Sequence, residues 1–253
     1  MGTRILALCF SLLAIPATGF ANNTTAAGAH SIVPGGTASE AQLHPITPER
    51  WYVFSAVAGR SYCAETQGGV MFDDGPTLLI DTTIDVFRAD TTTSIGSNND
   101  MSTEPRGNLL SRVCWIPANS ELTYVKIRAG APTDEFSVRV RVVETTLFSN
   151  WFYLGQDYSA FTMLRNTTNS SVSYTINWRS SLGNVVATIS GTLPANGSTF
   201  YDARSFAGAL AATSGTIDIA FTGSPQAIVA STTVLSTGTG LSFDAPFSQR
   251  TPW

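Results

Sequence analysis

The chain has 253 residues, of which 43% are hydrophobic, 10% are aromatic and only 13% are charged, and its formal net charge is −4 at pH 7. This apolar and aromatic content excludes a disordered chain, and the length is sufficient for one large β domain or for two sandwich-sized ones. The negative charge and a single lysine, Lys126, argue against a nucleic-acid-binding protein, which needs clustered positive charge to displace counterions.

The N-terminus has the three parts of an export signal. Arg4 supplies a positive charge, residues 5–13 are apolar, and Gly19 and Ala21 place small residues at the cleavage positions. The apolar run is too short to span a bilayer, and no longer one follows it. We therefore expect residues 1–21 to be a signal peptide, and the product to be secreted to the periplasm, the cell surface or the medium without a membrane span. The alternative is a buried N-terminal strand or helix.

Two cysteines, Cys63 and Cys114, remain once the predicted signal peptide, which contains Cys9, is removed. In an exported protein two thiols most simply form one disulfide. The alternative is a reactive thiol or a metal-binding pair, but the two histidines of the chain, His30 and His44, lie far upstream. We expect a structural disulfide.

The segment 22–48 is rich in Ala, Gly, Thr and Ser and shows no apolar period, which predicts a flexible leader. From residue 49 onward, strand-like segments alternate with turns. The clearest is 136–142, Phe-Ser-Val-Arg-Val-Arg-Val, in which every second residue is apolar, as in a strand with one buried face. The same period recurs at 122–128, 171–179 and 216–221, and no helical period of comparable length competes with it.

These segments predict an all-β chain with two tandem antiparallel β-sandwich domains, the first jelly-roll-like and the second immunoglobulin-like. We place the first domain at residues 49–145 and the second at residues 146–253. The boundary region, 144–149, contains no proline or glycine run. We therefore expect the two domains to abut rather than to swing on a linker.

The first domain resembles the bacterial pre-peptidase C-terminal family of β-sandwich modules over about residues 49–143. The matching segments are Trp-Tyr-Val-Phe at 51–54 with Ala-Gly at 58–59, then residues 84–90, 95–100 and 122–127. The cysteine pair is an addition to the pattern of that family, and its usual Gly-Thr-Tyr is Leu-Thr-Tyr here, at 122–124.

The second domain is similar to small immunoglobulin-like modules of secreted bacterial proteins over about residues 148–250. The shared features are Leu-Arg-Asn at 164–166, Asn-Trp-Arg at 177–179, a glycine turn at 182–183 and Leu-Pro-Ala-Asn-Gly at 193–197. Both resemblances imply accessory, adhesive or matrix-associated roles. Neither brings catalytic residues with it.

Calcium is the one cofactor for which the residues offer an argument, because hard cations bind carboxylate, amide and carbonyl oxygens of sandwich loops. Asp90 with Asn98, Asn99 and Asp100 forms one candidate set. A second set is Asp73 and Asp74 with Asp81. The alternative is that these residues form Asx turns, which need no ion. We otherwise expect no cofactor.

The residues give little support to catalysis. A hydrolase triad needs a histidine between a nucleophile and a carboxylate, and both histidines precede the first predicted strand. Asp73 and Asp74 resemble a glycosidase acid and base, but adjacent loop residues point apart, which favours a solvated turn. We therefore expect a protein that is not an enzyme.

Aromatic side chains are candidates for a surface that stacks on sugars. The candidates are Trp51, Tyr52, Trp115, Trp151, Tyr153 and Trp178. Trp178 shares its face with an apolar set and is expected in the core. Trp151 and Tyr153 lie two positions apart, so in a strand their side chains point to the same side. They predict an aromatic face at the domain junction, either as a binding groove or as the interface itself.

Together these features favour a secreted, non-enzymatic accessory or adhesive module that presents sandwich loops to an extracellular polysaccharide or protein. The alternative is a structural or assembly subunit that joins copies through an exposed strand edge or through the leader. A hydrolase whose site uses Asp73, Asp74 or Asp100 is the third and weakest interpretation.

Overall fold

A computed structural model describes residues 23–71, 80–101, 109–131, 134–155, 157–206 and 213–250. Within these ranges the chain consists of β-strands and turns, with two short 3-10 helices, η1 (Ala26–Gly28) and η2 (Ala203–Phe206). No helix in this part of the chain is long and apolar enough to cross a membrane. The expected all-β class, with tandem β-sandwiches, is confirmed.

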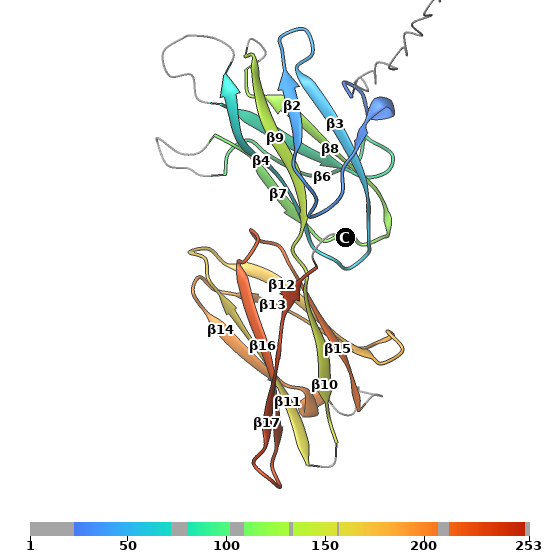
Figure 1. Cartoon of the computed structure of the whole chain (residues 1–253), viewed down its shortest axis with the longest axis vertical. Helices are drawn as coiled ribbons and strands as arrows, with labels where there is room; N and C mark the ends of the chain where they lie inside the picture. Colours follow the sequence, from blue (N-terminus) through green and yellow to red (C-terminus); the bar gives the residue numbers. More distant parts are fainter. Residues whose placement is uncertain are drawn as a thin grey trace, which may run out of the picture.

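The strands up to Glu144 form two facing sheets, the upper body of Figure 1. Their bounds are β1 (His30–Ser31), β2 (Ser39–Leu43), β3 (Glu49–Ala56), β4 (Tyr62–Met71), β5 (Thr82–Phe87), β6 (Ser94–Asn98), β7 (Arg112–Trp115), β8 (Glu121–Ala129) and β9 (Phe136–Glu144). Sheet I has the order β1-β3-β8-β5-β6, and sheet II has the order β2-β9-β4-β7. The short β1–β3 pair is parallel, and the other pairs are antiparallel.

The core of this first sandwich follows from the alternation of its strands. In β9 the valines at 138, 140 and 142 are buried, whereas the arginines between them lie on the outer face. The large side chains of Tyr52, Tyr62 and Phe136 fill the space between the sheets. Burial of one face of each sheet against the other supplies the hydrophobic free energy that holds the sandwich together.

The expectation of a flexible leader at residues 22–48 is wrong, because this segment contributes two strands to the first sandwich. β1 pairs with β3, and β2 pairs with β9 over its whole length. Ile32, Ala41 and Leu43 are 4%, 0% and 1% exposed. β2 does alternate between buried and outer residues, but over five residues the period is too short to stand out from the surrounding Ala, Gly, Thr and Ser.

Residues 89–101 are mostly polar and show no apolar period in the sequence. The structure places β6 within this segment, paired with β5 in a hairpin. Its sequence, Ser-Ile-Gly-Ser-Asn, has a single large apolar residue, Ile95, so it carries almost no strand pattern of its own.

The strands from Leu147 onward form the second sandwich, the lower body of Figure 1. Their bounds are β10 (Leu147–Tyr153), β11 (Tyr158–Asn166), β12 (Val172–Ser180), β13 (Val185–Leu193), β14 (Ser198–Asp202), β15 (Ser214–Phe221), β16 (Ile228–Ser236), β17 (Ser242–Pro246) and β18 (Ser248–Gln249). Sheet III has the order β13-β12-β15-β10-β18, and sheet IV has the order β14-β11-β16-β17. The predicted core position of Trp178 is confirmed, since its side chain is fully buried beside Ile176.

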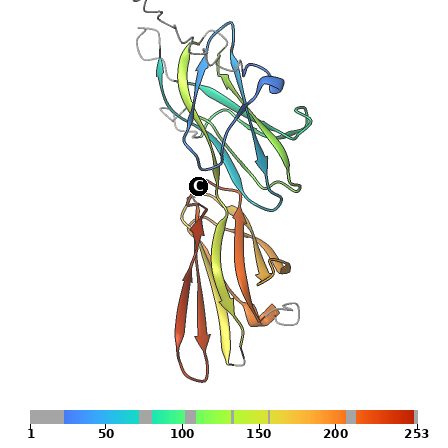
Figure 2. The same cartoon turned by 45° about the vertical axis from the view of Figure 1, so that its right-hand side comes forward.

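The two sandwiches are stacked end to end and joined by only two residues, Thr145 and Thr146 (Figure 2). Both threonines are buried. The Thr145 backbone N–H donates to the Ser61 carbonyl at 2.8 Å, and the Ser61 N–H donates to the Thr146 hydroxyl at 2.8 Å. The connection is therefore a buried, hydrogen-bonded segment rather than an exposed linker.

The packing of β2 is tested by a pair of apolar truncations within residues 22–48. Leu43→Ala is expected to lower the free energy of unfolding by about 3 kcal/mol, because it empties a fully buried site. Val33→Ala, at a side chain that is 62% exposed, is expected to change it by less than about 0.5 kcal/mol. Denaturant unfolding measures both variants, and equal small effects would contradict the packing of this segment.

Candidate functional site

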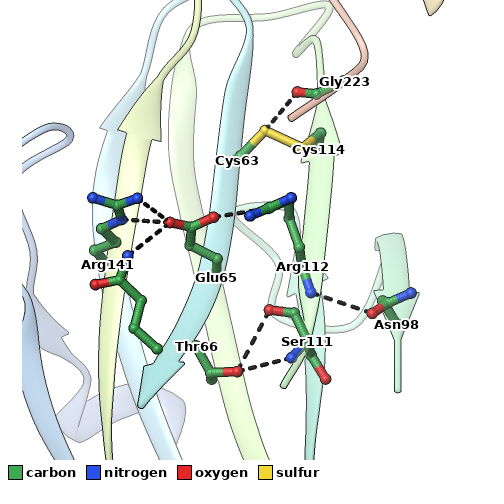
Figure 3. A network of polar contacts seen from close by, with 10 residues as sticks. Cys63, Glu65, Thr66, Asn98, Ser111, Arg112, Cys114, Arg141 and Gly223 are labelled. Carbon is green, nitrogen blue, oxygen red and sulfur yellow. Dashed lines mark hydrogen bonds and ion pairs between the residues drawn. A yellow bond between two sulfur atoms is a disulfide. The ribbon is translucent and has the colours of Figure 1, made fainter. Parts of the chain in front are cut away.

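The predicted disulfide between Cys63 and Cys114 is present. The two cysteines face each other in register on β4 and β7, on the outer face of sheet II. Cys63 Sγ also lies 3.0 Å from the carbonyl oxygen of Gly223 in the second sandwich (Figure 3). The disulfide is therefore part of the contact between the two sandwiches.

Beside the disulfide, on the same outer face, Glu65 is buried between two arginines (Figure 3). One carboxylate oxygen accepts a hydrogen bond from Arg112 Nε at 2.7 Å, and the other accepts from Arg141 and, at 3.0 Å, from Gln67 Nε2. Burial alone would raise the pKa of Glu65, but the hydrogen bonds and charges of the two arginines outweigh it and lower the pKa. The ionised, fully engaged carboxylate joins β4, β7 and β9 as a structural network.

The four residues of the main calcium hypothesis do not form one cluster. Asp90 lies in the turn between β5 and β6, whereas Asn98 ends β6 and Asn99 and Asp100 follow it. At about 3.3 Å per residue, β6 alone separates the two ends of this hairpin by roughly 13 Å. Asp90 and the segment from Asn98 to Asp100 therefore lie at opposite ends of the hairpin.

Oxygens of three of these residues, Asp90, Asn98 and Asn99, are also engaged within the fold. Asp90 accepts hydrogen bonds from the Thr93 hydroxyl at 2.6 Å and from the backbone N–H groups of Thr93 and Thr92 at 2.7 and 2.9 Å. These bonds lower the pKa of Asp90. The Oδ1 atoms of Asn98 and Asn99 accept hydrogen bonds from neighbouring strands. For Asp90 this is the geometry of the turn-forming alternative, whereas Asn98 and Asn99 are tied to neighbouring strands.

The second set of acids is only partly placed. Asp73 and Asp74 lie outside the described residues. Asp81 is described, and burial, followed by the charges of Asp100 and Asp134, raises the pKa of its carboxyl group. Within the described ranges no group of three or more His, Cys, Asp or Glu side chains is arranged to hold a metal ion. The hypotheses of calcium binding and of acid–base catalysis remain predictions.

The two histidines belong to the edges of different sheets. His30 is an exposed residue of β1, and its ring lies 6.5 Å from that of Tyr52. His44 follows β2, accepts a hydrogen bond from the Ile46 N–H at 3.1 Å and pairs with Glu135 at 3.5 Å. These contacts join each histidine to residues of the sheet edge or turn in which it lies.

The six aromatic candidates separate into core and surface residues. Tyr52, Trp115 and Trp178 are at most 5% exposed and belong to the two cores. Trp51 lies on the outer face of sheet I, but its ring packs on Phe87 and is covered by the Lys126 ammonium group, 5.4 Å from the ring centre. These four aromatic side chains are accounted for by packing.

Trp151 and Tyr153 lie on the same side of β10, as their spacing predicts. Their rings are 6.1 Å apart, with only 8° between their planes. Tyr158 meets Tyr153 edge-on at 5.4 Å, and Phe243 meets Trp151 edge-on at 6.3 Å. Trp151 is 40% exposed and Phe243 is 48% exposed. We call these four residues, Trp151, Tyr153, Tyr158 and Phe243, the aromatic strip.

The expectation that Trp151 and Tyr153 lie at the domain junction is wrong. β10 begins at the junction and runs away from it toward the far end of the second sandwich (Figure 1). Tyr153 lies six positions after Leu147, which corresponds to about 20 Å of strand. The aromatic strip is therefore a surface of the second sandwich alone.

β10, which carries two residues of the aromatic strip, is paired along only part of its outer edge within the described residues. Only Leu147 and Phe148 of β10 pair with β18, so residues 150–153 form a sheet edge in the described part of the chain. β17, the edge strand of sheet IV, lies beside β10. Exposed ring faces stack on apolar surfaces, and strand edges offer backbone N–H and C=O groups for hydrogen bonds. An extended ligand would find both at this place.

The spacing of the sequence indicates two of the four residues of the aromatic strip, Trp151 and Tyr153, but not Tyr158 and Phe243. Phe243 reaches Trp151 from β17, which belongs to a different sheet. No local pattern reveals that these two strands are neighbours. The alternation of Phe243 and Ala245 in β17 indicates a strand with one apolar side, but not which element that side would meet.

Comparisons with known proteins assign no family. No family model matches the chain, and no curated protein matches it. The chain is similar to the full extracellular region of zebrafish Gpr126/Adgrg6, with 9% identity and a TM-score of 0.25 over 89% of this chain and 34% of that one. It is also similar to a calcium-binding mutant of β-glucuronidase 2 from Bacteroides uniformis, with 9% identity and a TM-score of 0.19 over 80% and 26% of the two chains.

A third similarity is to a β-glucuronidase from glycoside hydrolase family 2, with 8% identity and a TM-score of 0.20 over 90% of this chain and 26% of that one. The chain thus spans about a third or less of the length of these proteins. Similarity at this level carries no information about activity or ligand.

The contribution of the disulfide can be measured directly. Replacing both Cys63 and Cys114 by Ser is expected to lower the free energy of unfolding by about 4 kcal/mol, because the 51-residue separation of the bridge restricts the unfolded chain. Denaturant unfolding measures the loss, and reduction of the unmodified protein should reproduce it. Free thiols at both positions in the oxidised, exported protein would contradict the bridge.

The Glu65 network predicts a pH dependence. Because the pKa of Glu65 is lower in the folded state, the ionised carboxylate stabilises the fold above its unfolded-state pKa of about 4.3. This stabilisation is lost as the pH falls through the folded-state pKa. Glu65→Gln should therefore lower stability at pH 7 and reduce the further loss of stability below about pH 4.3.

The matched control for Glu65→Gln is Glu135→Gln, which makes the same substitution in an exposed pair with His44. This control is expected to change the unfolding free energy at pH 7 by less than about 0.5 kcal/mol. Unfolding curves recorded from pH 7 down to acid compare the three proteins. Identical curves for Glu65→Gln and the unmodified protein would show that the arginine network contributes nothing to stability.

Proposed function

We propose that this chain is a secreted, non-enzymatic binding module that attaches to an extended extracellular polymer through the aromatic strip. The observation that carries the proposal is the pair of nearly parallel rings of Trp151 and Tyr153 on an open edge strand. Trp151 keeps 40% of its surface exposed, whereas Trp178, in the same sandwich, is fully buried. An exposed, preordered tryptophan contributes contact area at little entropic cost.

The chemistry of the strip favours an uncharged polymer such as a polysaccharide. Its four members are aromatic, and the C–H faces of sugar rings stack on such side chains. Backbone groups along residues 150–153 and the tyrosine hydroxyls supply hydrogen bonds for sugar hydroxyl groups. The strand, rather than the sandwich loops, is then the surface that makes contact.

The proposed export of the chain supports the same function. An N-terminal export signal, few charges and a disulfide are all typical of proteins that work outside the cell. The alternative function of an assembly subunit remains a proposal, and a separate surface, β13, favours it.

The proposal is tested by mixing the purified protein with a panel of insoluble polysaccharides and matrix proteins, with calcium or with a chelator. One polysaccharide should deplete the protein from the supernatant. Trp151→Ala should then weaken binding by about 10-fold or more, because it removes the central ring of the contact. The chelator arm independently tests the calcium hypothesis for Asp90 and Asp100.

The matched control is Phe200→Ala, which removes an aromatic side chain that is 66% exposed on the outer face of sheet IV, away from the strip. Its binding should equal that of the unmodified protein. Equal depletion by Trp151→Ala, or no depletion by any polymer, would contradict the proposal.

A further inference from the structure

The sheet edge formed by β13 is unusually long and unprotected. β13 pairs only with β12 and spans nine residues, whereas the other seven strands at sheet edges in the described part of the chain have two to five. Its sequence, Val-Val-Ala-Thr-Ile-Ser-Gly-Thr-Leu, has no charged residue and no proline. Charges, prolines and short length are the devices that keep edge strands from pairing with other chains. The one irregularity, a register shift near Val185, leaves the rest of the strand regular.

The two faces of β13 are each incomplete at this edge. On the outer face, the hydroxyls of Thr188, Ser190 and Thr192 form a ladder with β12 at 2.8, 2.9 and 3.2 Å. On the inner face, Ala187 and Ile189 pack against the core but stay partly exposed. An added strand would extend the hydroxyl ladder on one face and cover the margin of the core on the other.

We infer that β13 is a dimerisation edge that pairs antiparallel with β13 of a second copy of this chain, about a two-fold axis through Ser190. In that register Ser190 faces Ser190 of the second copy, and Thr188 faces Thr192. Hydroxyls thus meet hydroxyls, as they already do between β12 and β13.

The inner face supports the same register because large residues then lie opposite small ones. Ile189 faces Gly191 of the second copy, and Leu193 faces Ala187. A Cβ atom at Gly191 would lie only 2.6 Å from the Tyr174 hydroxyl, so the Tyr174 ring lies over this glycine. The opposing Ile189 would pack against that ring. The strand is therefore complementary to itself, which is the condition for an isologous dimer.

The sequence of β13 thus indicates which strand would pair with this edge, namely β13 of a second copy. A partner strand must be uncharged, β-branched and hydroxyl-bearing on alternate positions, and β13 has each of these properties. The dimer surface shares no residue with the aromatic strip, so the two proposals can be tested separately, each with variants that leave the other surface unchanged.

The test is sedimentation equilibrium of the purified protein across a concentration series. The unmodified protein should dimerise with a dissociation constant on the order of micromolar, as expected for a small edge-to-edge interface. Ser190→Lys places two positive charges directly opposite each other and should weaken the dimer by about 10-fold or more. Mixing the Ser190→Lys and Ser190→Glu proteins should restore association, because the opposed charges then attract.

The matched control is Ser173→Lys, an exposed residue of the same hydroxyl face on β12, one strand inside the edge. It should leave the dimer unchanged. The register is tested by Ser190→Cys, which should form a covalent dimer on mild oxidation, because directly opposed cysteines lie within disulfide reach. Ser173→Cys should not cross-link.

Two results would overturn the inference. One is an unmodified protein that stays monomeric at every concentration. The other is a dimer that Ser190→Lys leaves intact while Ser190→Cys fails to cross-link. Thermal unfolding of each variant shows whether it still folds, so that loss of the dimer can be distinguished from loss of the fold.

Discussion

The chain passes from one sandwich to the other through two buried threonines, and the geometry of the whole molecule depends on this passage. Thr145 and Thr146 are both bonded to Ser61, so the end of β9 and the start of β10 are held by the turn that precedes β4. The contact between Cys63 and Gly223 adds a second tie nearby. Each sandwich has its own core, and the two residues that join them are buried and hydrogen-bonded.

Elements whose signal is local could be predicted from the sequence. β9, β12 and β15 bury alternate apolar residues over most of their length, so the period of two in the sequence indicates both the strand and its inner face. The cysteine pair could be predicted because export and the count of two thiols leave one simple pairing. A strand of this kind depends on neighbouring residues, and the disulfide depends on the oxidising environment of an exported protein. The sequence contains a signal for each of these causes.

Elements that depend on distant partners could not be predicted. β2 is a strand because β9, about a hundred positions later, offers it a free edge, and Ala41 and Leu43 are buried only through that pairing. The aromatic strip has the same origin, since Phe243 reaches Trp151 from another sheet. The strip lies toward the far end of the second sandwich, not at the junction, because β10 runs away from the junction. The alternation of side chains predicts which residues share a face of a strand, but only the topology gives the position of that face.

The order of strands in sheet III has a consequence for valency. β13 lies at one edge, and β10, which carries Trp151, lies three strands away near the other. In a pair joined through β13, the two tryptophan-bearing strands are separated by seven strand spacings, or about 34 Å along one continuous sheet. A polymer with repeating units can then occupy both copies at once, and the second contact forms at high effective concentration. Weak single contacts would in this way add up to firm attachment.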